Sequence, residues 1–155
     1  MSEVVAIISA LTALCAVLIS PLVSLRNTDK QAKVSVLSAN RQKWIDSLRD
    51  LLAEFSTAVR VVGFEKTAPE KKKRIERLMF LEYKIKLMIN PKEDDHRRLV
   101  DVVAQARKLC SSVYGGVISP VEDSTAEDFN VALCSITEIG QTILKREWDR
   151  VKTFE

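Results

Sequence analysis

The sequence predicts an all-α protein in which one N-terminal transmembrane helix precedes an antiparallel bundle of about four helices. An uncharged apolar run near the N-terminus predicts the membrane helix, and apolar residues at spacings of three and four predict the bundle. No segment alternates with the period of a β-strand, and four glycines and four prolines among 155 residues are too few for a turn-rich β architecture.

The apolar run covers residues 4–25 and reads VVAIISALTALCAVLISPLVSL. A helix of roughly 22 residues is about 33 Å long, which is enough to cross a hydrocarbon core of about 30 Å. A cleaved signal peptide would need basic residues before the apolar run, whereas Met1, Ser2 and Glu3 precede it. We therefore expect residues 4–25 to form a membrane-spanning helix.

Basic residues follow the apolar run at Arg26, Lys30, Lys33, Arg41 and Lys43. Because positively charged flanks stay in the cytoplasm, we expect a cytoplasmic juxtamembrane segment at 26–36, separate from or continuous with the membrane helix, and an N-terminus outside. The three cysteines form no CxxC pair, which is typical of free thiols in a reducing compartment. The chain is thus predicted to be a single-pass protein of the bacterial inner membrane with a cytoplasmic bundle at 37–152.

Small residues recur four positions apart in the apolar run and would allow two such helices to approach closely. They are Ala6, Ser9, Ala10, Ala13, Ala16 and Ser20. This face predicts self-association into a homo-oligomer. Thr12 and Ser20 would face a pore in such an assembly or, alternatively, bond to carbonyls of their own helix, and Pro21 predicts a kink.

Local signals divide the bundle into four helices. The first is predicted over residues 34–62, and the second begins at a capping box formed by Thr67 and Glu70. The third begins at Asn90, and the fourth follows a loop at 117–123.

Each helix is expected to bury one apolar stripe against the others. The predicted core consists of Trp44, Leu48, Leu52, Phe55, Leu78, Ile85, Leu99, Leu109, Leu133, Ile136 and Trp148. Phe80, Tyr83 and Leu87 are expected to widen the stripe of the second helix. Cys110 and Cys134 also fall on apolar stripes, where they would be buried and unreactive.

His96 is the one histidine of the chain and follows Glu93, Asp94 and Asp95. These residue types can ligate a metal, but one helical turn cannot direct all four side chains at one ion. General acid–base catalysis by His96 would need a positioned partner that the sequence does not indicate. We therefore expect no metal, cofactor or catalytic residue here, and interpret the segment as a solvated helix start favoured by the helix dipole.

Two basic clusters occur in the bundle, and they consist of Lys71, Lys72, Lys73 and Arg74, and of Arg97 and Arg98. A solvated helix face is the simplest interpretation of both clusters. Together with Arg26, Lys30 and Lys33 they are also candidates for contact with acidic lipid head groups or a protein partner. Direct nucleic-acid binding is not expected, because no aromatic platform, helix-turn-helix or zinc pattern accompanies the clusters.

Three segments carry a resemblance to known proteins, and they read RQKWIDSLRDLLAE at 41–54, NPKEDDH at 90–96 and LKREWDRVK at 144–152. With the leading membrane helix, they resemble a widespread group of small, largely uncharacterised single-span bacterial membrane proteins. The resemblance implies a membrane location but no mechanism. In layout the chain is also similar to the pore-forming membrane accessory of RNA-targeting CRISPR systems.

Three functions follow as hypotheses. The leading one is a non-enzymatic, self-assembling inner-membrane protein, such as an oligomeric pore or a membrane-perturbing effector in antiviral defence. The second is a membrane-tethered adaptor that binds a cytosolic protein or nucleoprotein. The third, a membrane-bound nuclease or hydrolase, is disfavoured because the residues that catalysis needs are sparse, and because no arginine stands just before His96 as in helical ribonucleases of the HEPN type.

Overall fold

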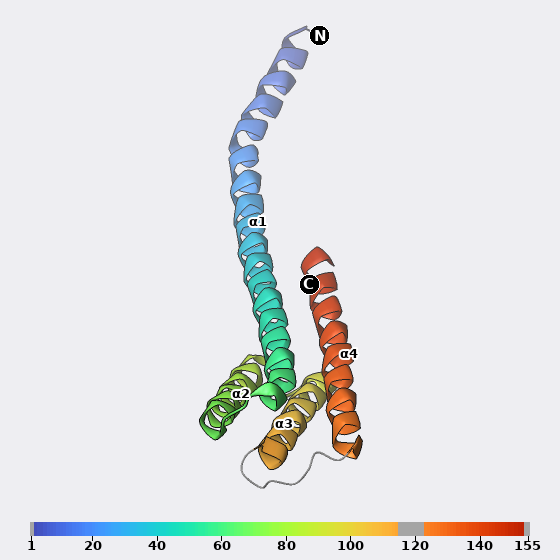
Figure 1. Cartoon of the computed structure of the whole chain (residues 1–155). Coiled ribbons are helices and arrows are strands. Elements are labelled where there is room, and N and C mark those ends of the chain that lie inside the picture. Colours follow the sequence, from blue (N-terminus) through green and yellow to red (C-terminus); the bar gives the residue numbers. More distant parts are fainter. Residues whose placement is uncertain (1, 115–122, 154–155) are drawn as a thin grey trace. The chain divides into compact units, whose positions relative to one another are not determined.

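The structure, a computed structural model, describes residues 2–114 and 123–153 (Figure 1). Within these ranges the helices are α1 at Ser2–Val61, the short 3-10 helix η1 at Val62–Phe64, α2 at Ala68–Met88, α3 at Asp94–Tyr114 and α4 at Asp123–Thr153. No described residue belongs to a β-strand, so the predicted all-α class is confirmed.

The chain divides into two compact units, Met1–Asn40 and Arg41–Thr153. Over the described part of the chain, no helix has a stretch long and apolar enough to cross a bilayer. Most side chains of the first unit lie outside the described residues, among them those of Ala6, Ala10, Ala13, Ala16, Ser20, Pro21, Arg26, Lys30 and Lys33. Ser9 is exposed, and the Thr12 hydroxyl donates a hydrogen bond to the Ile8 carbonyl at 2.8 Å, within its own helix.

The second unit is a helical bundle to which α1, α2, α3 and α4 all contribute core side chains. Of the predicted core residues, the buried ones are Leu48, Leu52, Phe55, Leu78, Ile85, Leu99, Leu133 and Ile136, while Trp44 and Leu109 are half-buried. A Cβ atom on Gly140 would come within 2.9 Å of Leu52 Cδ1, so the missing side chain at Gly140 allows α4 to approach α1 closely.

The start of α2 follows the predicted capping box. The Thr67 backbone N–H donates to Glu70 Oε2 at 3.1 Å, and the Glu70 backbone N–H donates to Thr67 Oγ1 at 3.4 Å. Pro69, in the first turn, lacks only a backbone donor that would have no partner within the helix. The predicted capping box is therefore confirmed.

The other predicted helix starts differ. α3 begins at Asp94, so the start predicted at Asn90 is wrong. The Asn90 side chain instead accepts a hydrogen bond from the Lys92 backbone N–H at 3.1 Å, which forms a turn before the helix. α4 begins at Asp123, which was predicted as the last residue of the loop at 117–123, and residues 117–122 lie outside the described ranges.

Several residues predicted for the core are exposed. Trp148 is 42% exposed, because Ile143 and Glu147 occupy the inner face of α4 and Trp148 lies about 140° around the helix from Ile143. Its ring lies 5.3 Å from Lys152 Nζ, a cation–π contact. Cys134 is exposed for a similar reason, since its neighbour Leu133 points inward.

The second helix shows the largest correction. Phe80, Tyr83 and Leu87, which were expected to extend its buried stripe, are 52%, 59% and 87% exposed. Leu78, Leu81 and Ile85 form the buried face, and the three exposed residues lie about 140–200° around the helix from Leu78. α2 therefore has apolar side chains on two opposite faces, of which the bundle covers one.

Candidate functional site

His96, in the first turn of α3, is only 3% exposed. The predicted solvated helix start is wrong because Trp44 of α1 stacks on the imidazole, with ring centroids 6.2 Å apart and an interplanar angle of 23°. The indole Nε1 of Trp44 donates a hydrogen bond to the Met88 carbonyl at 3.0 Å, which fixes the indole against the end of α2.

The connection between α2 and α3 orients the imidazole. His96 Nδ1 accepts a hydrogen bond from the Asn90 backbone N–H at 3.1 Å, so the ring proton lies on Nε2. Nε2 faces Glu93 Oε2 at 3.8 Å and Arg146 Nη2 at 3.2 Å. Because a guanidinium only donates, the Glu93 carboxylate is the acceptor that faces both of these donors.

Arg146 of α4 is the centre of an ion-pair network around His96. Its Nη1 donates to Asp95 Oδ2 at 2.6 Å, its Nη2 donates to Glu93, and its Nε lies 3.7 Å from Glu147 Oε1. Burial would lower the pKa of Arg146, but the hydrogen bond to Asp95 and the charges of the three carboxylates raise it above its ordinary value. Arg146 is therefore held as a permanent cation.

Glu147 connects this network to two more cations. Glu147 is 7% exposed, and its carboxylate accepts a hydrogen bond from Arg150 Nη1 at 2.5 Å and lies 3.7 Å from Arg41 Nε. Arg150 Nη1 also lies 3.8 Å from Glu93 Oε1. Three carboxylates thus face three guanidinium groups, and their charges balance in partly buried surroundings.

The segments 41–54, 90–96 and 144–152, on which the resemblance was based, meet in this network. They contribute Arg41 and Trp44, then Glu93, Asp95 and His96, and then Arg146, Glu147 and Arg150. The contact between the three segments could not be predicted from the sequence, because Arg146 lies 51 residues beyond Asp95 and helical periodicity indicates only local neighbours.

The network also bears on the metal question. Glu93, Asp95 and His96 each place one ligand atom within 4.8 Å of the others, whereas the Asp94 side chain is 85% exposed. One helical turn therefore gathers three of the four candidate ligands. Arg146 already donates hydrogen bonds to both carboxylates, so its guanidinium supplies the positive charge that a metal ion would otherwise supply. The arrangement is suited to fastening α3 to α4.

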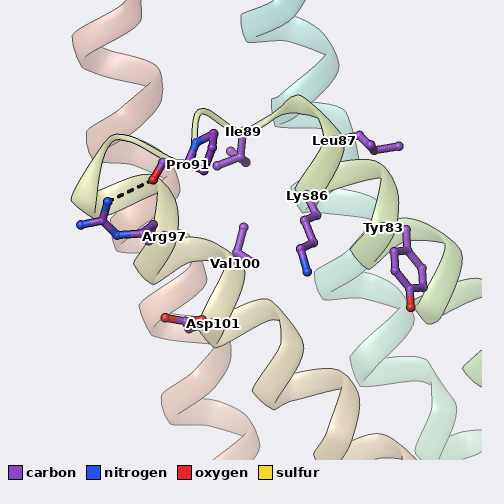
Figure 2. Close-up of a pocket in the computed structure, with 8 residues that line it drawn as sticks. All are labelled: Tyr83, Lys86, Leu87, Ile89, Pro91, Arg97, Val100 and Asp101. Carbon is purple, nitrogen blue, oxygen red and sulfur yellow. Dashed lines mark hydrogen bonds between the residues drawn. The ribbon is translucent and has the colours of Figure 1, made fainter.

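A pocket of about 670 Å³ lies between α2 and α3 (Figure 2). Its lining consists of Tyr83, Lys86, Leu87, Ile89, Pro91, Arg97, Val100 and Asp101. Lys86 from α2 and Val100 from α3 point toward the space between the two helices. We call this pocket the α2–α3 groove.

The α2–α3 groove and the ion-pair network share one connection. Ile89 and Pro91 line the groove, while the intervening Asn90 donates its backbone N–H to His96. Arg97 Nη1 donates to the Pro91 carbonyl at 3.0 Å, which holds the connection from the groove side. The network therefore holds the α2–α3 connection, which forms part of the groove lining.

The groove was not predicted, because Tyr83 and Leu87 were expected to lie in the core. A signal was present in Glu82, which interrupts the apolar pattern of α2. Its carboxylate accepts a hydrogen bond from Arg107 Nε of α3 at 2.7 Å. An acidic residue inside an apolar run thus marked the edge of the buried face.

The predicted basic clusters do not form one uniform surface. Lys72 and Lys73 are exposed and Lys71 is half-buried, whereas Arg74 pairs with Glu65 at 2.7 Å. In the second cluster Arg97 pairs with Asp94, and Arg98 is exposed.

No family model matches the chain, and no curated protein or solved structure matches it. The proposals below therefore rest on the geometry of the second unit and on the sequence.

Replacing Arg146 with Met should destabilise the second unit, because Glu93 and Asp95 would repel each other without a cation between them. We expect the free energy of unfolding in urea to fall by about 1–3 kcal/mol, since the site is partly open to solvent. The matched variant Arg49→Met removes an exposed pair with Asp46 and should cost less than about 1 kcal/mol. Equal losses in the two variants would contradict a central role for Arg146.

Stability should also fall in acid through Asp95. Burial raises the pKa of this carboxyl, but the hydrogen bond and charge of Arg146 lower it by more, to below its ordinary value of 3.8. The unfolded state therefore binds more protons, so the stabilisation is complete well above pH 3.8 and is lost as pH falls below that value. Urea unfolding of Asp95→Asn should depend less on pH in this range than unfolding of the unchanged protein, and identical pH dependence would refute the assignment.

Proposed function

We propose that the chain is a non-enzymatic, membrane-anchored adaptor whose second unit binds a protein partner. The observation that carries the proposal is the α2–α3 groove, which adjoins the exposed residues Phe80, Tyr83 and Leu87. Contiguous exposed apolar side chains beside a concavity are typical of interaction sites. Anchoring through residues 4–25 rests on the hydropathy of that segment.

The reactive side chains support a binding role over catalysis. His96 is covered by Trp44, and both carboxylates next to it are engaged by Arg146. Burial raises the pKa of the Cys110 thiol to about 12, which suppresses the nucleophilic thiolate. Cys134 is exposed, but the one histidine of the chain is the enclosed His96, so it has no imidazole base.

A second candidate function is self-assembly in the membrane, as a pore or a membrane-perturbing effector in antiviral defence. The spacing of Ala6 with Ala10 and of Ser9 with Ala13 favours it, because small residues four apart allow close helix contact. In this case the membrane segment, and not the α2–α3 groove, would carry the function.

Deleting the residues before Arg26 separates the two functions. An adaptor should retain its partner in chemical crosslinking but no longer sediment with membranes, because the bundle binds and the anchor only localises. The full chain serves as the control for both readouts. Loss of the crosslinked partner together with the anchor would contradict the adaptor.

Self-assembly predicts that Ala10→Leu lowers the mass of the detergent-extracted protein, since added bulk would separate the helix backbones. The matched variant is Ile8→Leu, which lies about 200° around the helix from Ala10 and should leave the mass unchanged. If the unchanged protein is monomeric at micromolar concentration in detergent, self-assembly is refuted.

A further inference from the structure

We propose that the α2–α3 groove binds an acidic amphipathic helix of a partner protein. This inference rests on the proposed adaptor function and names the chemistry of the partner. It goes beyond that function because it specifies the shape, the charge and the contact residues of the ligand.

The shape of the surface fits a helix. Phe80, Tyr83 and Leu87 follow one another at spacings of three and four, so they form one exposed stripe along α2. Val100 of α3 lies across the groove from Lys86 of α2, and Ile89 also lines it (Figure 2). A ligand helix presents apolar side chains at the same three- and four-residue spacing, and such a stripe can lie in a groove between two helices.

The charge of the surface selects an acidic ligand. The lining of the groove contains the basic residues Lys86 and Arg97 and the acidic residue Asp101, and Arg97 is already paired with Asp94. Lys84 and Lys86 are exposed, and neither forms an ion pair with a described residue. Asp101 is the one carboxylate of the groove lining, on the α3 side. Glutamates on a ligand helix would therefore be attracted to the α2 side of the groove, where Lys86 lies.

The same features disfavour other occupants. A second copy of the chain would bring Lys84 and Lys86 of both copies toward one another across the contact, which costs energy through like-charge repulsion. A bilayer surface could touch the convex stripe at Leu87 but would not fill a concavity between two helices. A helix with projecting side chains fits both the stripe and the groove.

The test uses the full chain in nanodiscs of phosphatidylcholine and two fluorescein-labelled model peptides. One peptide places leucines on one face of a helix and glutamates on the other, and its matched control has lysine in place of glutamate. Binding is measured by fluorescence anisotropy at low and at high salt. We expect the acidic peptide to bind at least about tenfold more tightly than the basic one, and more weakly at high salt.

Two variants locate the binding. Leu87→Asp should raise the dissociation constant of the acidic peptide about tenfold or more, because it places a carboxylate in the apolar stripe. Lys86→Glu should weaken binding and reduce its salt dependence. The matched control is Val131→Asp, which alters a 59% exposed apolar residue of α4 and should leave binding unchanged. Leu87 is 87% exposed, so its variant should fold, which circular dichroism checks.

Equal affinity for the two peptides would overturn the inference, as would equal effects of Leu87→Asp and Val131→Asp. Loss of peptide binding when phosphatidylglycerol replaces part of the phosphatidylcholine would also overturn it, because anionic lipid would then cover the α2 face.

A cellular partner that still crosslinks to the Leu87→Asp variant would refute the groove as the binding site and leave the adaptor function intact. Conversely, a chain that binds the acidic peptide but does not sediment with membranes would refute the anchored adaptor and support the groove.

Discussion

The contact of Arg146 with Glu93 and Asp95 is the interaction on which the α2–α3 connection depends. The guanidinium belongs to α4, whereas its two carboxylate partners stand at the start of α3, so one side chain fixes where α3 begins relative to α4. Without that cation the two carboxylates would repel each other beside a buried imidazole. The same connection supplies Ile89 and Pro91 to the groove, so the shape of the proposed binding surface depends on ion pairs that lie outside the groove lining.

Features that arise from neighbours in sequence could be predicted. The Thr67 cap depends on residues three positions apart, and the burial of Leu48 and Phe55 follows from a helical repeat with polar residues on the other side. The all-α class follows from the same periodicity, since a repeat of three and four cannot be accommodated in a strand.

Apolar periodicity alone could not predict which face of a helix the bundle covers. α2 is apolar on two sides, and periodicity alone does not say that Leu81 points inward while Phe80 points outward. His96 was expected to be solvated because its neighbours in sequence are acidic. Its environment is instead set by Trp44 and Arg146, which are 50 or more positions away in the sequence. Such pairings belong to the tertiary structure, and a single sequence carries no local trace of them.

The connection between α2 and α3 differs from an ordinary surface loop in how its backbone is satisfied. The N–H of Asn90 is bound by His96, that of Lys92 by the Asn90 side chain, and that of Glu93 by the Asn90 carbonyl, while Pro91 has no N–H to satisfy. Exposed loops usually tolerate extra residues because water can bond to their backbone. Here an inserted residue would shift each donor away from its acceptor, so the length of this connection is fixed by hydrogen bonding, and natural variation in chain length should accumulate elsewhere.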